Sequence, residues 1–166
     1  MLFRSGSEAA RPALRNYTGR AVVLQTDTKP EYAQDLLAKI DSFIGQAHAE
    51  LARTLDVAAQ PRPTKVIVFE TQERYQDYAR VHAPGLVNNG GYYDGGLRTV
   101  VTYRYNNSMQ LYFHELVHAM MGEQFGDHHF SRYTRRNWPI WFDEGMAEYL
   151  GSLDRKSTRL NSSHIT

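Results

Sequence analysis

Residues 108–125 (SMQLYFHELVHAMMGEQF) are apolar on almost every side of a helix, yet they carry two histidines and a glutamate at their centre. The apolar positions are Leu111, Phe113, Leu116, Val117, Ala119, Met120 and Met121. A helix that is apolar all round is typically buried in a protein core. Unpaired charge is costly there, so burying these polar side chains makes sense if a cation compensates them. This segment therefore predicts a buried helix with a cation beside it.

The polar centre of this helix is the motif HELVH, in which His114 and His118 are four residues apart. Side chains at that spacing share one helix face and can bind the same ion. Two neutral imidazoles suit zinc, with Zn–N bonds of roughly 2.0–2.1 Å. Glu115 is rotated by about 100° from His114, so it lies beside the ion, placed to act as general base on a metal-activated water. The alternative is a helix with two core histidines and an exposed glutamate.

A catalytic zinc site needs a third protein ligand. The extended motif HExxHxxGxxH is excluded, because Met121 and Gln124 occupy its glycine and third histidine positions. The remaining downstream candidates are His128, His129, Asp143, Glu144 and Glu148. His128 and His129 lie in a polar segment, so we expect them to be a solvated pair. The acids of the last predicted helix remain.

That last helix contains WFDEGMAEYLGSL, residues 141–153, in which three acids lie among large apolar side chains. Glu144 and Glu148 are four apart and share a face, whereas Asp143 points about 100° away from Glu144. The helix can therefore present Glu144 to the metal and Glu148 to the free N–H of a ligating histidine. Asp143 is expected to be a solvated neighbour. The alternative is an amphipathic helix with three solvated acids.

The rest of the chain predicts an α+β domain. Strands are expected at residues 21–26, 65–69 and 99–105, an edge strand within 88–96, and helices at 31–55, 71–81, 108–125 and about 139–153. The order β-α-β-α-β-β-α-α suggests a small mixed sheet with helices packed on it. We assign residues 20–153 to this domain and residues 1–19 to an N-terminal extension.

Residues 154–166 break sharply with the preceding composition. They are polar and show no helical or strand period. The string DRKSTRLNSSH resembles an in-frame translation of a sequencing adapter. We therefore treat this segment as a non-native tail, give no role to His164, and expect the natural domain to be truncated near Leu153.

Composition excludes several classes of function. With 42% apolar and 22% charged residues, the chain reads as an ordinary globular domain. A net charge of +1 without a basic run argues against nucleic-acid binding. The absence of cysteine excludes disulfides and thiolate metal sites. No segment is long and apolar enough to be a membrane span or a signal peptide, and the compartment stays open.

HELVH followed by WFDEGMAEY resembles the gluzincin metallopeptidases. The spacing between the two motifs is closest to that of uncharacterised peptidase-MA-like domains, which also have a strand before a G-Y-Y turn. The resemblance implies a zincin-like fold and a Zn²⁺ ion bound by His114, His118 and Glu144. It also implies that Glu115 is the general base and that Glu148 supports a ligating histidine. Peptides or proteins would be the substrates.

The segment NNGGYYDGG, residues 88–96, resembles the edge strand beside a gluzincin cleft. An unpaired strand edge offers backbone N–H and C=O groups to an extended peptide. Gly91, Tyr92 and Tyr93 are therefore candidate substrate-binding residues. A plain hairpin, with the two tyrosines as core and surface residues, is the alternative.

The favoured function is a zinc-dependent metallopeptidase, and the alternative is a non-catalytic, zinc-stabilised module that binds peptides. A third hypothesis is a zinc-free helical scaffold. Gluzincins commonly stabilise the oxyanion with a Tyr or His beyond the third ligand, close to which this chain ends. Tyr103, Tyr105 and Tyr149 are the candidates within the chain. If the donor instead lies past Leu153, the fragment would bind zinc without turnover.

Overall fold

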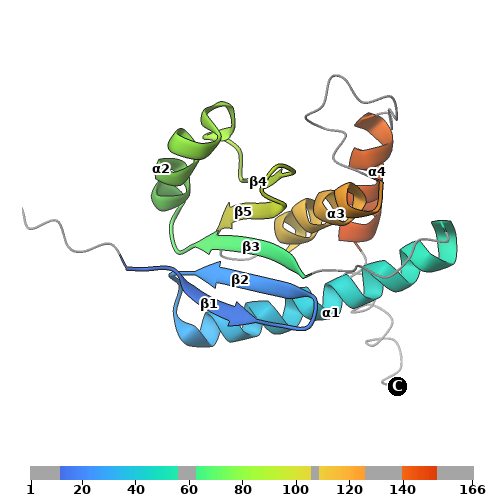
Figure 1. The fold of residues 1–166 in the computed structure, drawn as a ribbon, viewed down its shortest axis with the longest axis horizontal. Helices are drawn as coiled ribbons and strands as arrows, with labels where there is room; N and C mark the ends of the chain where they lie inside the picture. The colour runs from blue at the N-terminus through green and yellow to red at the C-terminus, as the bar shows by residue number, and fades with distance from the viewer. Residues whose placement is uncertain (1–11, 56–62, 106–108, 126–139, 153–166) are drawn as a thin grey trace, which may run out of the picture.

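The computed structural model describes residues 12–55, 63–105, 109–125 and 140–152, which form a mixed α+β fold (Figure 1). The elements are β1 (Arg15–Thr18), β2 (Val22–Thr26), α1 (Pro30–Leu55), β3 (Thr64–Phe69), α2 (Gln72–His82), a 3₁₀ turn (Pro84–Leu86), β4 (Gly91–Asp94), β5 (Thr99–Tyr103), α3 (Gln110–Phe125) and α4 (Ile140–Gly151). The prediction of a small sheet with packed helices is confirmed.

The sheet has the strand order β1-β2-β3-β5-β4. Strands β2, β3 and β5 run parallel, while β1 and β4 are antiparallel edge strands. β4 lies where the sequence predicts an edge strand. β1 was not predicted: it falls in residues 1–19, so the sheet begins earlier in the chain than expected.

Helices cover both faces of the sheet, as the uninterrupted apolar run of β3 requires. Val66 and Val68 of β3 point into a core shared with α1, α3 and α4. Ile67 and Phe69 point to the opposite face and pack with Tyr75 and Ala79 of α2. The alternation of strand side chains thus divides the apolar residues between two cores.

α3 lies in the larger core, as its apolar sequence predicts. Leu116, Val117 and Met120 are fully buried, and the ring of Phe113 stacks on that of Phe43 in α1 with centroids 4.0 Å apart. α4 packs along α3 and contributes the buried side chains of Ala147 and Leu150. The HELVH motif is therefore placed by contacts with α1, α4 and the sheet.

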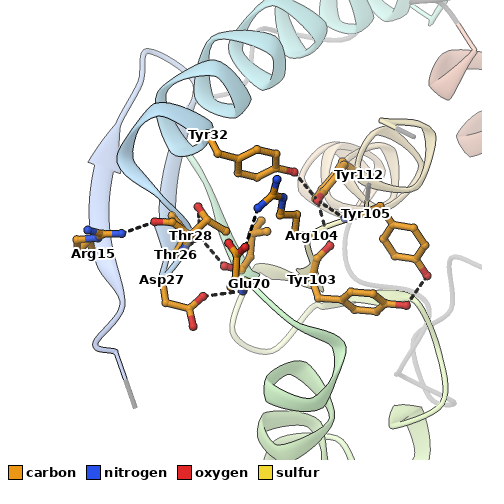
Figure 2. Close-up of polar contacts among 11 residues, drawn as sticks. Arg15, Thr26, Asp27, Thr28, Tyr32, Glu70, Tyr103, Arg104, Tyr105 and Tyr112 are labelled. Atoms are coloured by element: carbon orange, nitrogen blue, oxygen red, sulfur yellow. Dashed lines mark hydrogen bonds and ion pairs between the residues drawn. The ribbon is translucent and has the colours of Figure 1, made fainter. Parts of the chain in front are cut away.

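A polar network joins the start of α3 to the ends of the parallel strands (Figure 2). The buried hydroxyl of Tyr112 donates a hydrogen bond to the carbonyl of Tyr103 (3.0 Å) and accepts one from the backbone N–H of Tyr105 (3.1 Å). Tyr32 of α1 lies 3.1 Å from the same hydroxyl. Burial raises the pKa of Tyr112, so its hydroxyl stays protonated and can donate. The network fixes α3 two residues before His114.

Replacing Tyr112 with Phe should lower the free energy of unfolding by about 1–3 kcal/mol, because it leaves the partly buried N–H of Tyr105 and C=O of Tyr103 without this partner. Urea denaturation measures the change. Tyr32→Phe is the matched control and should cost less, since it removes a single contact at the rim of the network. Equal, negligible losses in both variants would contradict this role for the network.

Several sequence-based assignments fall outside the described residues. These are the expected start of the HELVH helix at residue 108, the polar segment with His128 and His129, the expected start of the last helix near residue 139, and the tail at residues 154–166. Among the described helices, none combines the length and apolarity needed to cross a membrane.

Candidate metal centre

α3 and α4 bring three of the predicted site residues together. His114 and His118 of α3 and Glu144 of α4 each offer a ligand atom, and these atoms lie within 4.8 Å of one another. The Nε2 atoms of the two histidines are 3.1 Å apart. Oxygen atoms of Glu144 lie 3.4 Å from Nε2 of His114 and 3.7 Å from Nε2 of His118. Two imidazoles and one carboxylate thus converge on one point.

This donor set fits zinc. In a tetrahedral site with bonds of roughly 2.0–2.1 Å, neighbouring ligand atoms are about 3.3 Å apart. The three separations in the structure, 3.1, 3.4 and 3.7 Å, lie close to that value. Three electron-rich atoms this close together repel one another unless a proton or a metal ion lies between them. A divalent ion with nitrogen and oxygen ligands suits the arrangement.

The opposite ring nitrogens of both histidines face carboxylates. Nδ1 of His118 is 2.9 Å from Oδ2 of Asp143, and Nδ1 of His114 is 3.6 Å from Oε1 of Glu148. An Nδ1–H that points at a carboxylate leaves the Nε2 lone pair free to bind a metal. Asp143 therefore orients the imidazole of His118 by a hydrogen bond, while Glu148 faces His114 at a separation too long for one.

The expectation that Asp143 is a solvated neighbour was wrong. Asp143 is 7% exposed and holds the more buried histidine, whereas the side chain of Glu148 is 66% exposed. Sequence reasoning missed this role because helical spacing shows which residues share a face and not which face meets α3. A signal was present in the large apolar residues beside Asp143, since they indicated an enclosed helix.

The two histidines differ in their electrostatic environment. Burial lowers the pKa of His114, and the neighbouring His118 lowers it further. Burial also opposes protonation of His118, but its hydrogen bond to Asp143 and the negative charge of that carboxylate raise the pKa of His118. Asp143 thus makes the largest contribution among those that raise the pKa of His118.

Replacing Asp143 with Ala should weaken zinc binding by about 10–100-fold, because His118 loses the acceptor that orients its ring. Asp143→Asn keeps an oxygen that can accept from Nδ1–H and should restore part of the affinity. Competition titration with a zinc-binding dye measures both values. Unchanged affinity in Asp143→Ala would rule out the orienting role.

Glu115 lies beside the donor set and in contact with the sheet edge. Its carboxylate accepts a hydrogen bond from the backbone N–H of Tyr93 in β4. Burial raises the pKa of Glu115 to about 7, against the opposing effects of His118 and the Tyr93 N–H. A carboxyl group with a pKa near neutrality can both accept and return a proton at physiological pH.

The donor set opens into a cleft between α3 and β4. This cavity has a volume of about 320 Å³. Its lining residues are Leu86, Asn89, Gly91, Tyr92, Tyr93, His114, Glu115, His118 and Glu144. The three candidate substrate-binding residues of β4 thus lie opposite the candidate metal ligands. Leu86 and Asn89, which precede β4, are lining residues that the sequence analysis missed.

The three tyrosines considered as oxyanion donors are absent from the described lining of the cleft. The hydroxyl of Tyr103 donates to that of Tyr105 (2.8 Å) within the polar network. The hydroxyl of Tyr149 donates to Oε1 of Glu50 in α1 (3.1 Å). The structure therefore places none of them beside the donor set.

Comparison with known proteins identifies one family. A sequence model of a peptidase family described as collagenase matches residues 21–165. The matched range contains β2 to α4 and extends through most of the segment that the sequence analysis treats as a tail. A search of curated proteins found no match. The narrower resemblance to peptidase-MA-like domains remains a prediction.

Proposed function

The chain belongs to the collagenase family of zinc metallopeptidases, and we propose that it hydrolyses peptide bonds at a zinc ion bound by His114, His118 and Glu144. The observation that carries the proposal is the convergence of these three ligand atoms at the wall of a cleft that also contains Glu115. If His114 and His118 were only structural, they would not need the partly buried carboxylate of Glu115 beside them.

When bound, zinc supplies Lewis acidity, which polarises the scissile carbonyl and makes a water molecule more acidic. The residues that would hold the ion are His114 and His118, through Nε2, and Glu144, through its carboxylate. The hydrogen bond to Asp143 keeps His118 in the tautomer that has a free Nε2, and Glu148 would do the same for His114 by moving closer to its Nδ1. Family membership supports zinc as the metal.

Glu115 moves the protons of the reaction. Its carboxylate takes a proton from the attacking water as the oxygen bonds to the carbonyl carbon. Glu115 then gives this proton to the amide nitrogen as the C–N bond breaks. The second proton of the water also passes to the leaving amine, so the products are a carboxylate and an ammonium group. Burial raises the pKa of Glu115, which favours its holding the proton between the two transfers.

β4 is proposed to bind the substrate backbone. Backbone groups of an antiparallel edge strand point alternately towards and away from the neighbouring strand. Because the N–H of Tyr93 is directed at Glu115 and away from β5, the backbone N–H of Gly91 also faces the cleft side. An extended peptide can pair with this edge and bring a carbonyl towards the donor set.

Zinc content and peptide cleavage, measured on the same preparation, test the proposal. We expect one zinc per chain, cleavage of unstructured protein substrates, loss of both on chelation, and recovery with added zinc. The proposal fails if the chain binds no zinc stoichiometrically. If zinc binds but no substrate is cleaved, the non-catalytic peptide-binding module becomes the better description.

A further inference from the structure

The turn between β4 and β5 contains a strained residue. Arg98 has φ = 51°, the one positive φ among the described non-glycine residues. This region is disfavoured for an L-residue that has a Cβ. The preceding Gly95 and Gly96 could adopt such a conformation at little cost, but the chain has an arginine at the strained position. A compensating contact is therefore expected at the side chain of Arg98.

That contact is a two-point ion pair with Glu123 of α3. Nε of Arg98 donates to one carboxylate oxygen of Glu123, and the Nη2 atom pairs with the other. The side chain of Glu123 is only 7% exposed, whereas that of Arg98 is 43% exposed. A nearly buried carboxylate needs a charged partner, and the planar guanidinium supplies both hydrogen bonds in one geometry.

This pair adds to other polar links between the β4–β5 hairpin and α3. The hydroxyl of Tyr112 in α3 bonds to the backbone of Tyr103 and Tyr105 at the end of β5, and the N–H of Tyr93 in β4 donates to Glu115. Both carboxylates belong to α3, with Glu123 two helical turns beyond Glu115. The cleft lies between the same two elements. The distance between β4 and α3 is thus fixed at Glu115 and again at the β4–β5 turn, by Arg98.

We propose that Arg98 and Glu123 are positioning residues that fix β4 against α3 and so set the distance between the bound peptide backbone and the metal centre. The inference rests on the proposed function for its effect on catalysis. Neither residue lines the cleft, so both would act through β4. Loosening the pair should weaken substrate alignment and leave the metal ligands in place.

Arg98→Asn removes the ion pair with Glu123 but keeps the backbone conformation, because asparagine tolerates a positive φ. We expect hydrogen exchange at the Tyr93 amide to accelerate roughly three- to tenfold, since the β4–β5 hairpin loses its ion pair with α3. Zinc affinity should stay unchanged. In peptide cleavage, KM should rise by a similar factor with a smaller change in kcat.

Two further variants keep the test decisive. Glu123→Gln removes the negative charge of the pair. The double variant Arg98→Asn/Glu123→Gln should show the same exchange rate as Arg98→Asn alone, because both substitutions break the same interaction. The double variant replaces Arg98→Asn if the unpaired Glu123 prevents folding. Arg80→Gln is the control, since it breaks an exposed pair with Asp77 on α2, away from the cleft.

The proposal is overturned if the Tyr93 amide exchanges at the wild-type rate in both Arg98→Asn and the double variant. It is also overturned if Arg80→Gln accelerates that exchange equally. A wild-type chain that cleaves no peptide would refute the proposed function alone, because the exchange experiment measures the attachment of β4 without any turnover.

Discussion

Glu115→Gln should reduce peptide cleavage by about 10²–10⁴-fold while zinc content stays at one ion per chain. Glutamine has nearly the same shape as glutamate and can still contact the backbone of Tyr93, but it cannot take a proton from water. Single-turnover cleavage of a fluorogenic peptide, with zinc measured on the same sample, provides both values.

Glu73→Gln is the matched control, because Glu73 is an exposed carboxylate in the first turn of α2, remote from the lining of the cleft. It should leave cleavage unchanged. Wild-type turnover in Glu115→Gln would show that another group is the base, and loss of zinc in that variant would show that Glu115 holds the metal.

Glu144→Ala should weaken zinc binding by roughly 10²–10⁴-fold, if one of three protein ligands contributes about a third of the ~10–16 kcal/mol typical of zinc sites. The helix should survive, because the side chain of Glu144 is half-exposed and leaves no buried cavity. Equilibrium competition with a chelator of known affinity measures the change.

Asp35→Ala serves as the comparison, since it removes an exposed carboxylate from α1 that pairs with Lys39 at the surface. Its zinc affinity should equal that of the wild type. If Glu144→Ala also keeps full zinc affinity, the third ligand lies elsewhere. If the wild-type protein itself takes up no metal, the zinc-free helical scaffold becomes the explanation.

The sequence predicted the parts of the site that follow from spacing within one helix. His114 and His118 share a face because they are four residues apart, and the apolar side chains around them predicted the burial of α3. Glu144 could be proposed because the downstream motif resembles that of known metallopeptidases. The structure then brings these three residues together.

Features that depend on the packing of separate elements could not be predicted. The burial of Asp143 depends on the face that α4 turns towards α3, and the pair of Arg98 with Glu123 depends on where the β4–β5 turn meets α3. β1 was missed because the strand is short and mostly exposed, so its side chains show no apolar alternation. Such features follow from tertiary contacts that local periodicity does not encode.

Anomalous diffraction at the zinc absorption edge, from crystals grown with one equivalent of zinc, tests the central claim most directly. The account predicts a single strong peak between Nε2 of His114, Nε2 of His118 and the carboxylate of Glu144, roughly 2.0–2.2 Å from each ligand atom. A peak at any other set of residues, or none at this position, would contradict it.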